Sequence, residues 1–327
     1  MDRSHSSQSQ PIAEDVKLLT VVAPNRDEGC SPTGLVGRRL AGQLLAAGDP
    51  VRVLAELKER SGWPAEVEVV TGSISQPLPS AEIFAGVDAV FLAGAHPSTV
   101  EASLRLARDA GVRRIVLLSS HGPEYEQYNP PETWHWLAIE RAVERCGIEW
   151  THLRPSAVMG SVRSGTYPAT GSDWPQSIRT AGAVREAFLD TGHYPFIHEG
   201  DLAAIAAAAM HTDHYAGTVI EAVGLPSSTQ SRVRSIAHAI GRDIQAINVT
   251  AAESRATWQR NGWPEGAIEV TLYALQEYGA RLTELTEWTV AQRPSVRDII
   301  GRSPRTYDEW AAENADLFLW SCSRPAR

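Results

Sequence analysis

The chain has 327 residues, of which 43% are hydrophobic and 21% are charged, as is typical of a globular protein. Its formal net charge of −9 argues against a nucleic-acid partner, because affinity for a phosphate backbone depends largely on Lys and Arg. No stretch of the sequence has the roughly 18 to 20 consecutive apolar residues of a membrane helix, so we expect no membrane partner.

The cysteines and the first residues bear on where the protein works. Cys30, Cys146 and Cys322 lie far apart and show neither a CxxC motif nor a Cys/His metal spacing. They predict reduced thiols, no metal site and a cytoplasmic location. Residues 1–15 are polar and lack the apolar core of a signal peptide, so we interpret them as a disordered leader. We expect a monomer or homodimer that acts on a small molecule.

Short apolar runs alternate with helical patterns in the first half of the chain. The runs are LLTVV (18–22), VRVLA (51–55), VEVV (67–70), VDAVFLA (87–93), VRRIVLLSS (112–120) and IEWTHLR (148–154). The helical patterns cover residues 35–47, 80–85, 99–110 and 134–146. This alternation predicts βαβ units and a parallel sheet, and the continuous apolar runs indicate strands that are covered on both faces. Gly48, Gly111 and Gly147 follow three of the helical patterns, where a left-handed cap is expected.

The pattern changes after Arg154. Residues 156–200 are rich in Gly, Ser, Pro, Thr and aromatic residues, and the next helix is expected to have Asp201 as its N-cap. The remaining expected elements are that helix over 200–210, a strand over 217–224, helices over 233–241 and 271–282, and two short helices around a proline turn over 295–320.

This order of elements predicts an α/β protein with a Rossmann-type doubly wound parallel sheet and a small C-terminal α/β substrate lobe. After the leader, we assign residues 16–155 to a dinucleotide-binding domain. We assign residues 156–327 to a substrate-binding lobe that is interleaved with this domain over the carboxyl edge of the sheet.

The segment APNRDEGCSPTGLVGRRL (23–40) contains part of a nucleotide-binding loop. Gly34 and Gly37 fit the helix-proximal glycines, which let a pyrophosphate approach the backbone at a helix N-terminus. Ser31 replaces the first glycine, Pro32 removes an N–H donor, and residues 24–30 are inserted. The loop is either a remodelled dinucleotide site, which we favour, or a relic that only packs strand against helix.

Glu56 lies at the end of the second expected strand, about 20 residues past the glycines. A carboxylate at this position bonds the ribose hydroxyls of NAD and repels the 2′-phosphate of NADP. The basic residues Arg38, Arg39, Lys58 and Arg60 are close in the sequence and could still meet a phosphate. Glu56 could instead be a solvated loop charge. We therefore expect NAD or NADP as cofactor, with NAD favoured and binding weakened by the altered loop.

An ordered series of segments resembles the NmrA-like atypical short-chain dehydrogenases. The segments are TGLVGRRLAGQLLAAG (33–48), VEVVTG (67–72), GVDAVFLAG (86–94), ARDAGVRRIVLLSS (107–120), IERAVERCGIEWTHLRPSAVM (139–159), GDLAAIAAAAM (200–210) and IIGRSPRTYDEWAAENADLF (299–318). The resemblance implies a Rossmann domain with NADP or NAD and a C-terminal lobe that closes the substrate pocket. Members include quinone and enone reductases, reductases of plant phenolics, and regulators that bind the cofactor without turning it over.

The resemblance also places cofactor contacts at the strand ends. Ser73 stands where the family often has an Asp near adenine, so adenine would meet the backbone around Ser73 and Ile74. Pro155 belongs to the family's L-R-P motif beside the nicotinamide pocket. The expected cofactor contacts are Thr33, Gly34, Leu35, Val36, Gly37, Glu56, Ser73, Ile74, Gly94, Ser119 and Pro155.

The proton-transfer residues depart from the short-chain dehydrogenase pattern. The superfamily uses Tyr-x-x-x-Lys on the helix after the fifth strand, and these positions fall here on about Glu132 and Trp136. Ser120 and His121 follow the fifth strand directly, and His135 lies near the Lys position. Because an imidazole can move a proton near neutral pH, the expected catalytic residues are Ser120, His121 and His135. The alternative for each is an ordinary surface-loop residue.

Aromatic residues are frequent in the segments that are expected to surround the substrate. Such a lining suits a flat apolar or aromatic ligand held by a few polar groups, although ordinary core packing is the alternative for each residue. The expected pocket residues are Tyr125, Trp134, Trp136, Tyr167, Trp174, Tyr194 and Phe196.

Three functions are open on these grounds. We favour an NAD(P)-dependent reductase of a small aromatic, quinone or enone substrate in secondary metabolism, without the Tyr-x-x-x-Lys pair. The second is a non-redox enzyme on the same scaffold, such as a cyclase, isomerase or dehydratase. It is supported by the altered loop and by the replaced pair. The third is a dinucleotide-sensing regulator without catalysis.

Overall fold

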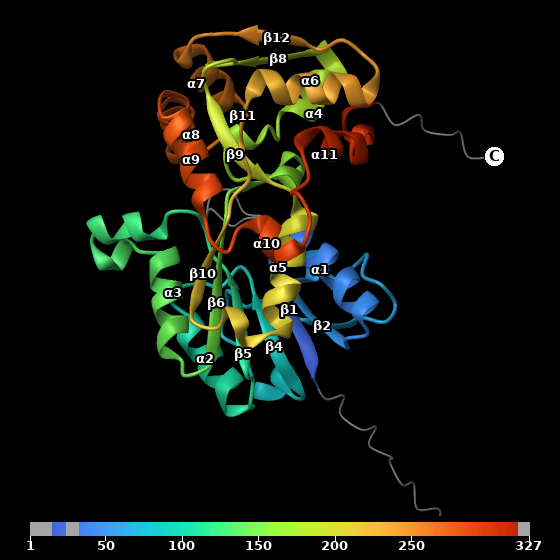
Figure 1. The fold of residues 1–327 in the computed structure, drawn as a ribbon, viewed down its shortest axis with the longest axis vertical. Coiled ribbons are helices and arrows are strands. Elements are labelled where there is room, and N and C mark those ends of the chain that lie inside the picture. Colours follow the sequence, from blue (N-terminus) through green and yellow to red (C-terminus); the bar gives the residue numbers. More distant parts are fainter. Residues whose placement is uncertain (1–14, 24–32, 320–327) are drawn as a thin grey trace, which may run out of the picture.

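The computed structural model describes residues 15–23 and 33–319, and Figure 1 shows two lobes stacked along the long axis of the molecule. The lower lobe contains a large sheet, and the upper lobe contains two small sheets with their helices. Nearly all of the expected leader over 1–15 and the altered loop over 24–32 lie outside the described residues.

The large sheet has seven strands, and every neighbouring pair among them is parallel. The spatial order is β10 (Thr218–Ala222), β6 (Glu149–Pro155), β5 (Arg114–Leu118), β4 (Val87–Leu92), β1 (Val16–Val21), β2 (Val51–Ala55) and β3 (Glu68–Thr71). The chain winds outward from β1 to β3 and then in the other direction from β4 to β10. The carboxyl ends of β1 and β4 are thus the topological switch point, where ligands of such sheets bind. The predicted doubly wound Rossmann sheet is confirmed.

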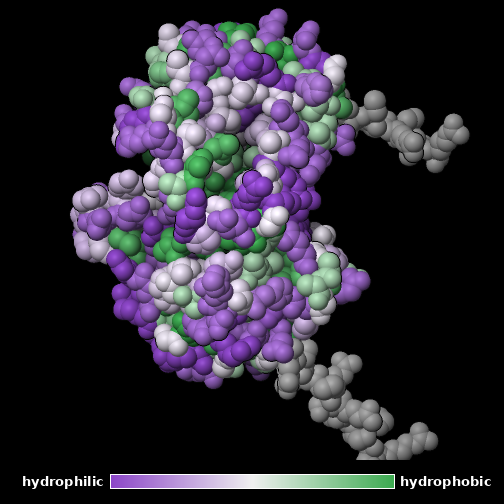
Figure 2. Space-filling model, viewed as in Figure 1, coloured by the Kyte–Doolittle hydropathy of each residue, from purple (hydrophilic) through white to green (hydrophobic). Residues whose placement is uncertain are grey.

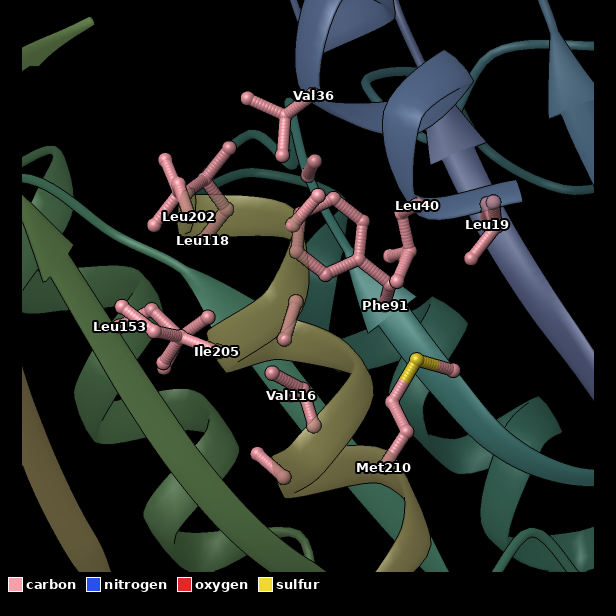
Figure 3. Packing of buried hydrophobic residues seen from close by; sticks show 14 of the residues in the cluster. Leu19, Val36, Leu40, Phe91, Val116, Leu118, Leu153, Leu202, Ile205 and Met210 are labelled. Atoms are coloured by element: carbon pink, nitrogen blue, oxygen red, sulfur yellow. The ribbon is translucent and has the colours of Figure 1, made fainter. Parts of the chain in front are cut away.

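Helices cover both faces of this sheet, which explains the continuous apolar runs. The covering helices are α1 (Thr33–Ala47) and α5 (Glu199–His211) on one face, and α2 (Val100–Asp109) and α3 (Trp136–Arg145) on the other. Neighbouring strand residues point to opposite faces: Leu19 packs with the α1 and α5 side, and Leu18 packs with the α2 and α3 side. Figure 3 shows Leu202 and Ile205 of α5 lying over Val116 and Leu118 of β5.

The upper lobe is built from residues that lie on both sides of β10 in the sequence. Its strands are β7 (Ala157–Val158), β9 (His193–Ile197) and β11 (Pro226–Ser228) in one sheet, and β8 (Ala183–Glu186) with β12 (Gln245–Asn248) in the other. Its helices are α4 (Trp174–Ala181), α6 (Thr229–Ile240), α7 (Ala251–Arg260), α8 (Glu265–Ala280), α9 (Leu282–Ala291) and α11 (Tyr307–Glu313). The short helix α10 (Val296–Ile300) packs instead on α5, in the core of the large domain. By contrast, β10 is a strand of the large sheet and α5 covers one face of that sheet, although both follow residue 156.

Short 3-10 helices complete the described chain. They are η1 (Leu57–Glu59), η2 (Ala81–Phe84), η3 (Pro123–Tyr128), η4 (Pro131–Thr133), η5 (Met159–Arg163), η6 (Pro168–Thr170), η7 (Asp213–Tyr215) and η8 (Ala315–Phe318). The helix expected over 80–85 is therefore only the single turn η2. No helix in the described ranges has the length and apolar character to span a bilayer.

The predicted N-cap of α5 is wrong. His198 caps this helix by accepting a hydrogen bond from the Gly200 N–H, and Asp201 lies within the first turn. Asp201 is fully buried and accepts hydrogen bonds from the Arg305 backbone and guanidinium, both at 2.6 Å, and also pairs with Arg302. Its carboxylate thus ties the segment before α11 to the large domain.

The core of the upper lobe contains a buried charge cluster. The Arg232 guanidinium lies over the rings of Trp174 and Phe196, at 4.5 and 4.4 Å from the ring centroids. Glu186 is buried beside them and accepts a hydrogen bond of 2.5 Å from Trp174 Nε1. Burial raises the pKa of Glu186 to about 7, although the Trp174 N–H and the Arg232 charge act in the opposite direction.

We expect Glu186 to make the protein less stable as the pH rises from about 4.5 to about 7. In this window the folded carboxyl keeps a proton that the unfolded chain has lost, so the unfolded state binds fewer protons and the free energy of unfolding falls. Glu186→Gln removes this titration. The melting temperature of the variant, measured relative to wild type, should therefore be higher at about pH 8 than at about pH 5. A difference that does not change with pH would contradict the assignment.

Candidate active site

A cavity of about 810 Å³ lies between the carboxyl edge of the large sheet and the upper lobe. Figure 2 shows the hollow between the lobes on one face of the molecule. Residues that follow β2, β4 and β5 form one wall, including Glu56, Gly94 and Ser119. The opposite wall comes from the upper lobe, with Tyr194 of β9 and Tyr278 of α8. The cavity therefore contains the switch point of the sheet.

Glycines bring the backbone close together at this switch point. Gly94 has a φ of +76°, and a Cβ at this residue would lie 2.3 Å from Cγ2 of Val22. A Cβ at Gly37 would lie 3.0 Å from Cγ2 of Val21. The Thr33 hydroxyl accepts from the Val22 N–H at 2.8 Å and so ties the start of α1 to the end of β1. The two glycines thus let α1 and the end of β4 pack closely on β1, and the N-terminus of α1 opens at the cavity with Thr33, a position that fits the pyrophosphate of a dinucleotide.

The structure brings about half of the expected cofactor contacts to the cavity. The contacts that line it are Thr33, Val36, Glu56, Gly94, Ser119 and Pro155. Gly34, Leu35, Gly37, Ser73 and Ile74 do not line it. Ile74 packs in the core, and the Ser73 hydroxyl faces Glu56. Ser75 and Gln76 line the cavity instead, so the loop after β3 meets it two residues later than expected.

Glu56 is held in place at the carboxyl end of β2. Its carboxylate accepts hydrogen bonds from the Ser73 hydroxyl at 2.6 Å and from the Ala23 N–H at 3.0 Å. The arginines near it in the sequence have other partners. Arg38 pairs with Glu59 at 3.2 Å and lies over Trp63, and Arg39 pairs with Glu313 at 3.4 Å. Neither Arg38 nor Arg39 therefore makes an ion pair with Glu56.

The three expected catalytic residues, Ser120, His121 and His135, all line the cavity. His121 Nδ1 lies 3.2 Å from Oε2 of Glu221, which is in β10. The ring also contacts the edge of Trp288, with 5.2 Å between centroids. The carboxylate orients the imidazole and can stabilise its protonated form.

A network around Arg154 supports this pair. Arg154, in β6, makes two hydrogen bonds to the buried Glu140 of α3, at 3.0 and 2.8 Å, and contacts Glu124 and Glu221. Ser119 donates to Glu140 at 2.7 Å. Burial alone would lower the pKa of Arg154, but the surrounding carboxylates raise it well above its usual range. Arg154 therefore stays charged and fixes the position of Glu221.

His135 lies in a different environment at the start of α3. The Glu126 carboxylate accepts hydrogen bonds from the backbone N–H groups of His135, Trp136 and Leu137, at 2.9 to 3.1 Å. Burial, and then the neighbouring His96, lower the pKa of His135. The His96 and His135 rings meet edge to face at 5.9 Å, and both line the cavity. Both effects favour the neutral form of the His135 ring, and no carboxylate of residues 15–23 and 33–319 makes a hydrogen bond to it.

The sequence did not single out His96, although it follows Gly94 at the end of β4. The same rule that selected His121, a polar side chain just past a strand end, would have found it.

The structure brings only some of the expected substrate-pocket residues to the cavity. Trp136, Tyr167 and Tyr194 line the cavity, while the exposed Tyr125 does not.

Three further aromatic expectations are wrong. Trp174 and Phe196 are buried in the core around Arg232, and Trp134 packs away from the cavity with its Nε1 donating to the Asn129 carbonyl at 3.0 Å. An aromatic residue alone does not distinguish a pocket from a core. Within the described ranges, no three His, Cys, Asp or Glu side chains are arranged to hold a metal ion.

Similarity to known proteins agrees with this geometry. A model of the NAD(P)H-binding family matches residues 32–180. The (4-alkanoyl-5-oxo-2,5-dihydrofuran-3-yl)methyl phosphate reductase of Streptomyces griseus is 30% identical over 292 residues, which are 88% of this chain and 96% of that protein. The chain belongs to the NAD(P)H-binding family. It is an oxidoreductase that uses a nicotinamide dinucleotide.

Solved structures support the fold of this NAD(P)H-binding protein. The triphenylmethane reductase of Citrobacter sp., solved with NADP(H), has a TM-score of 0.63 at 20% identity and covers 92% of this chain and 99% of its own. NmrA, a negative transcriptional regulator, has a TM-score of 0.61 at 15% identity, with 93% and 96% covered. The chain thus shares the fold of these two proteins, as the resemblance in the sequence implied.

Arg154 is expected to be essential for stability because Glu140 is only 1% exposed. Arg154→Met leaves that carboxylate buried without its cation, which costs about 3–5 kcal/mol of unfolding free energy. Arg141→Met is the matched control, because Arg141 pairs with Glu144 on an exposed helix surface and should cost less than about 0.5 kcal/mol. Urea unfolding measures both variants. Equal losses would show that the buried network is not the stabilising feature.

Proposed function

We propose that the protein reduces a small aromatic, quinone or enone substrate in the cavity, with the proton supplied by His121. The nicotinamide dinucleotide, when bound, supplies the hydride, which adds to an electron-poor carbon of the substrate. The name of the S. griseus relative describes an unsaturated five-membered lactone with an alkanoyl group on its double bond, which is a conjugated acceptor of this kind. Hydride addition to such a system places negative charge on a carbonyl oxygen, and that charge needs a proton.

The observation that carries this proposal is the contact between His121 and Glu221 at the ligand edge of the sheet. Because Nδ1 faces the carboxylate, Nε2 is the nitrogen that can transfer a proton to the substrate. Glu221 stabilises the imidazolium before the transfer and then accepts the remaining Nδ1–H. This pair would take the place of the Tyr-x-x-x-Lys pair, whose positions fall on about Glu132 and Trp136.

We expect His121→Ala to lower turnover at least about 100-fold, because general acid catalysis is typically worth about 10² to 10⁴ in rate. Glu221→Gln should cost less, since the ring keeps a hydrogen-bond partner but loses the charge beside it. His135→Ala should also cost less. The measurement is NADH or NADPH oxidation with 1,4-naphthoquinone and 4-phenylbut-3-en-2-one, after circular dichroism shows that each variant is folded.

Two outcomes would contradict this assignment. Near-normal turnover in His121→Ala together with loss of activity in His135→Ala would move the proton donor to the start of α3. Unchanged turnover in both variants would assign the proton to a tyrosine, a carboxylate or water.

We also propose that NAD is preferred over NADP. The support is Glu56, which places a fixed carboxylate at the end of β2, where the adenosine ribose of a Rossmann cofactor lies. Arg38 and Arg39 are paired with Glu59 and Glu313 and so offer little to a 2′-phosphate.

Removal of the Glu56 charge should narrow this preference. We expect wild type to bind NADH at least as tightly as NADPH, and Glu56→Gln to improve NADPH affinity relative to NADH several-fold. Glu66→Gln, an exposed carboxylate outside the cavity, is the control and should leave the ratio unchanged. Calorimetric titration with both cofactors provides the measurement. A strong NADPH preference in wild type would overturn the role of Glu56.

A further inference from the structure

We propose that Tyr167, Tyr194 and Tyr278 form a hydrogen-bond donor subsite that binds an uncharged oxygen acceptor of the substrate, such as a carbonyl, and disfavours carboxylate and phosphate groups. The inference rests on the proposed function, because it states which group of the proposed substrate these tyrosines bind. It concerns binding, however, and does not depend on which residue supplies the proton.

The three tyrosines reach one wall of the cavity from three separate elements. Tyr167 directly precedes η6, Tyr194 lies in β9 and Tyr278 lies in α8, and all three line the cavity. The rings of Tyr194 and Tyr278 meet edge to face, with 5.4 Å between centroids and 64° between planes. Phe196 packs against Tyr194 at 5.6 Å. The wall is thus an aromatic surface with hydroxyl groups.

The buried residues behind this wall hold it in place. Arg232 donates to the Ala169 carbonyl at 3.0 Å and lies over the Phe196 ring at 4.4 Å. Thr170 donates to the Tyr167 carbonyl at 2.8 Å. The segment that carries Tyr167 and the strand that carries Tyr194 are therefore both fixed against one fully buried guanidinium. A preorganised wall of this kind loses little entropy when a ligand binds.

The hydroxyls of this wall can donate hydrogen bonds to a ligand. Burial raises the pKa of Tyr167, Tyr194 and Tyr278, so all three stay protonated at neutral pH. The hydrogen bonds found within residues 15–23 and 33–319 include none to these three hydroxyls. A phenol can donate one proton to a carbonyl oxygen, and aromatic rings beside it suit the apolar body of such a ligand.

The charge of the cavity argues against an anionic group. Among the described residues that line it, none is Lys or Arg, and Glu56 adds a negative charge at the cofactor end. A carboxylate or phosphate that leaves water without a cation loses hydration that neutral donors replace only in part. The phosphate named for the S. griseus relative has no Lys or Arg partner among these residues, and the His121 imidazolium of the proposed function is already paired with Glu221.

A matched pair of probes tests the subsite. Acetophenone and benzoate have similar shapes, but the first presents a neutral carbonyl and the second an anion. Calorimetry with the protein saturated with NAD⁺ should show tighter binding of acetophenone. Tyr194→Phe and Tyr278→Phe should each weaken acetophenone binding roughly 3- to 10-fold, the usual effect of one lost hydrogen bond, and leave benzoate binding unchanged.

Tyr128→Phe is the control, because Tyr128 is 79% exposed and lies outside the cavity. Benzoate binding as tight as acetophenone binding, no acetophenone binding to wild type, or unchanged acetophenone affinity in both cavity variants would overturn the proposal. The complex contains oxidised cofactor, so no hydride is transferred during the titration. Failure of the proposed reduction would appear only in the turnover assay, and the two failures can be told apart.

Discussion

The architecture of the site depends on the buried ion pair between Arg154 and Glu140. Burying a carboxylate is costly unless a charged partner and further hydrogen bonds satisfy it, and Glu140 has both, from Arg154 and from the Ser119 hydroxyl. The pair links β6 to α3 at the point where β5 ends. The same guanidinium contacts Glu221 on β10, so the strand that positions the partner of His121 is fixed by the charge that anchors α3. Three strands and one helix are thereby held in register at the ligand edge.

This arrangement leaves His121 beside a carboxylate and His135 without one. Both imidazoles face the same cavity, yet Glu126 uses its carboxylate to cap α3 through backbone N–H groups and so does not serve the His135 ring. The environments of the two histidines therefore separate their chemistry. The carboxylate of Glu221 orients the His121 ring, whereas burial lowers the pKa of His135 and favours its neutral form.

The sequence predicted the features that depend on local pattern. Continuous apolar runs identified the strands of the large sheet, and the position of His121 after a strand end placed it at the cavity, because the carboxyl ends of parallel strands share one edge. Features that depend on tertiary packing could not be predicted from the sequence. Tyr278 reaches the cavity from a helix more than a hundred residues away from His121. Trp174 was assigned to the pocket because aromatic residues favour both pockets and cores, and only the position of Arg232 shows that this indole packs in the core.

The two walls of the cavity differ in a way that separates cofactor from substrate recognition. On the sheet side, Gly94 has no side chain and the N-terminus of α1 begins at the cavity with Thr33, so backbone groups are available to a phosphate-bearing ligand. On the lobe side, aromatic side chains close the space and present neutral hydroxyls. A dinucleotide is recognised by backbone dipoles and a helix N-terminus, which need no cation from the substrate side. The wall that the upper lobe contributes to the cavity has no Lys or Arg among its described residues, so an anionic molecule binds less favourably at the substrate end. The charged cofactor and an uncharged substrate are thus directed to opposite ends of one continuous cavity.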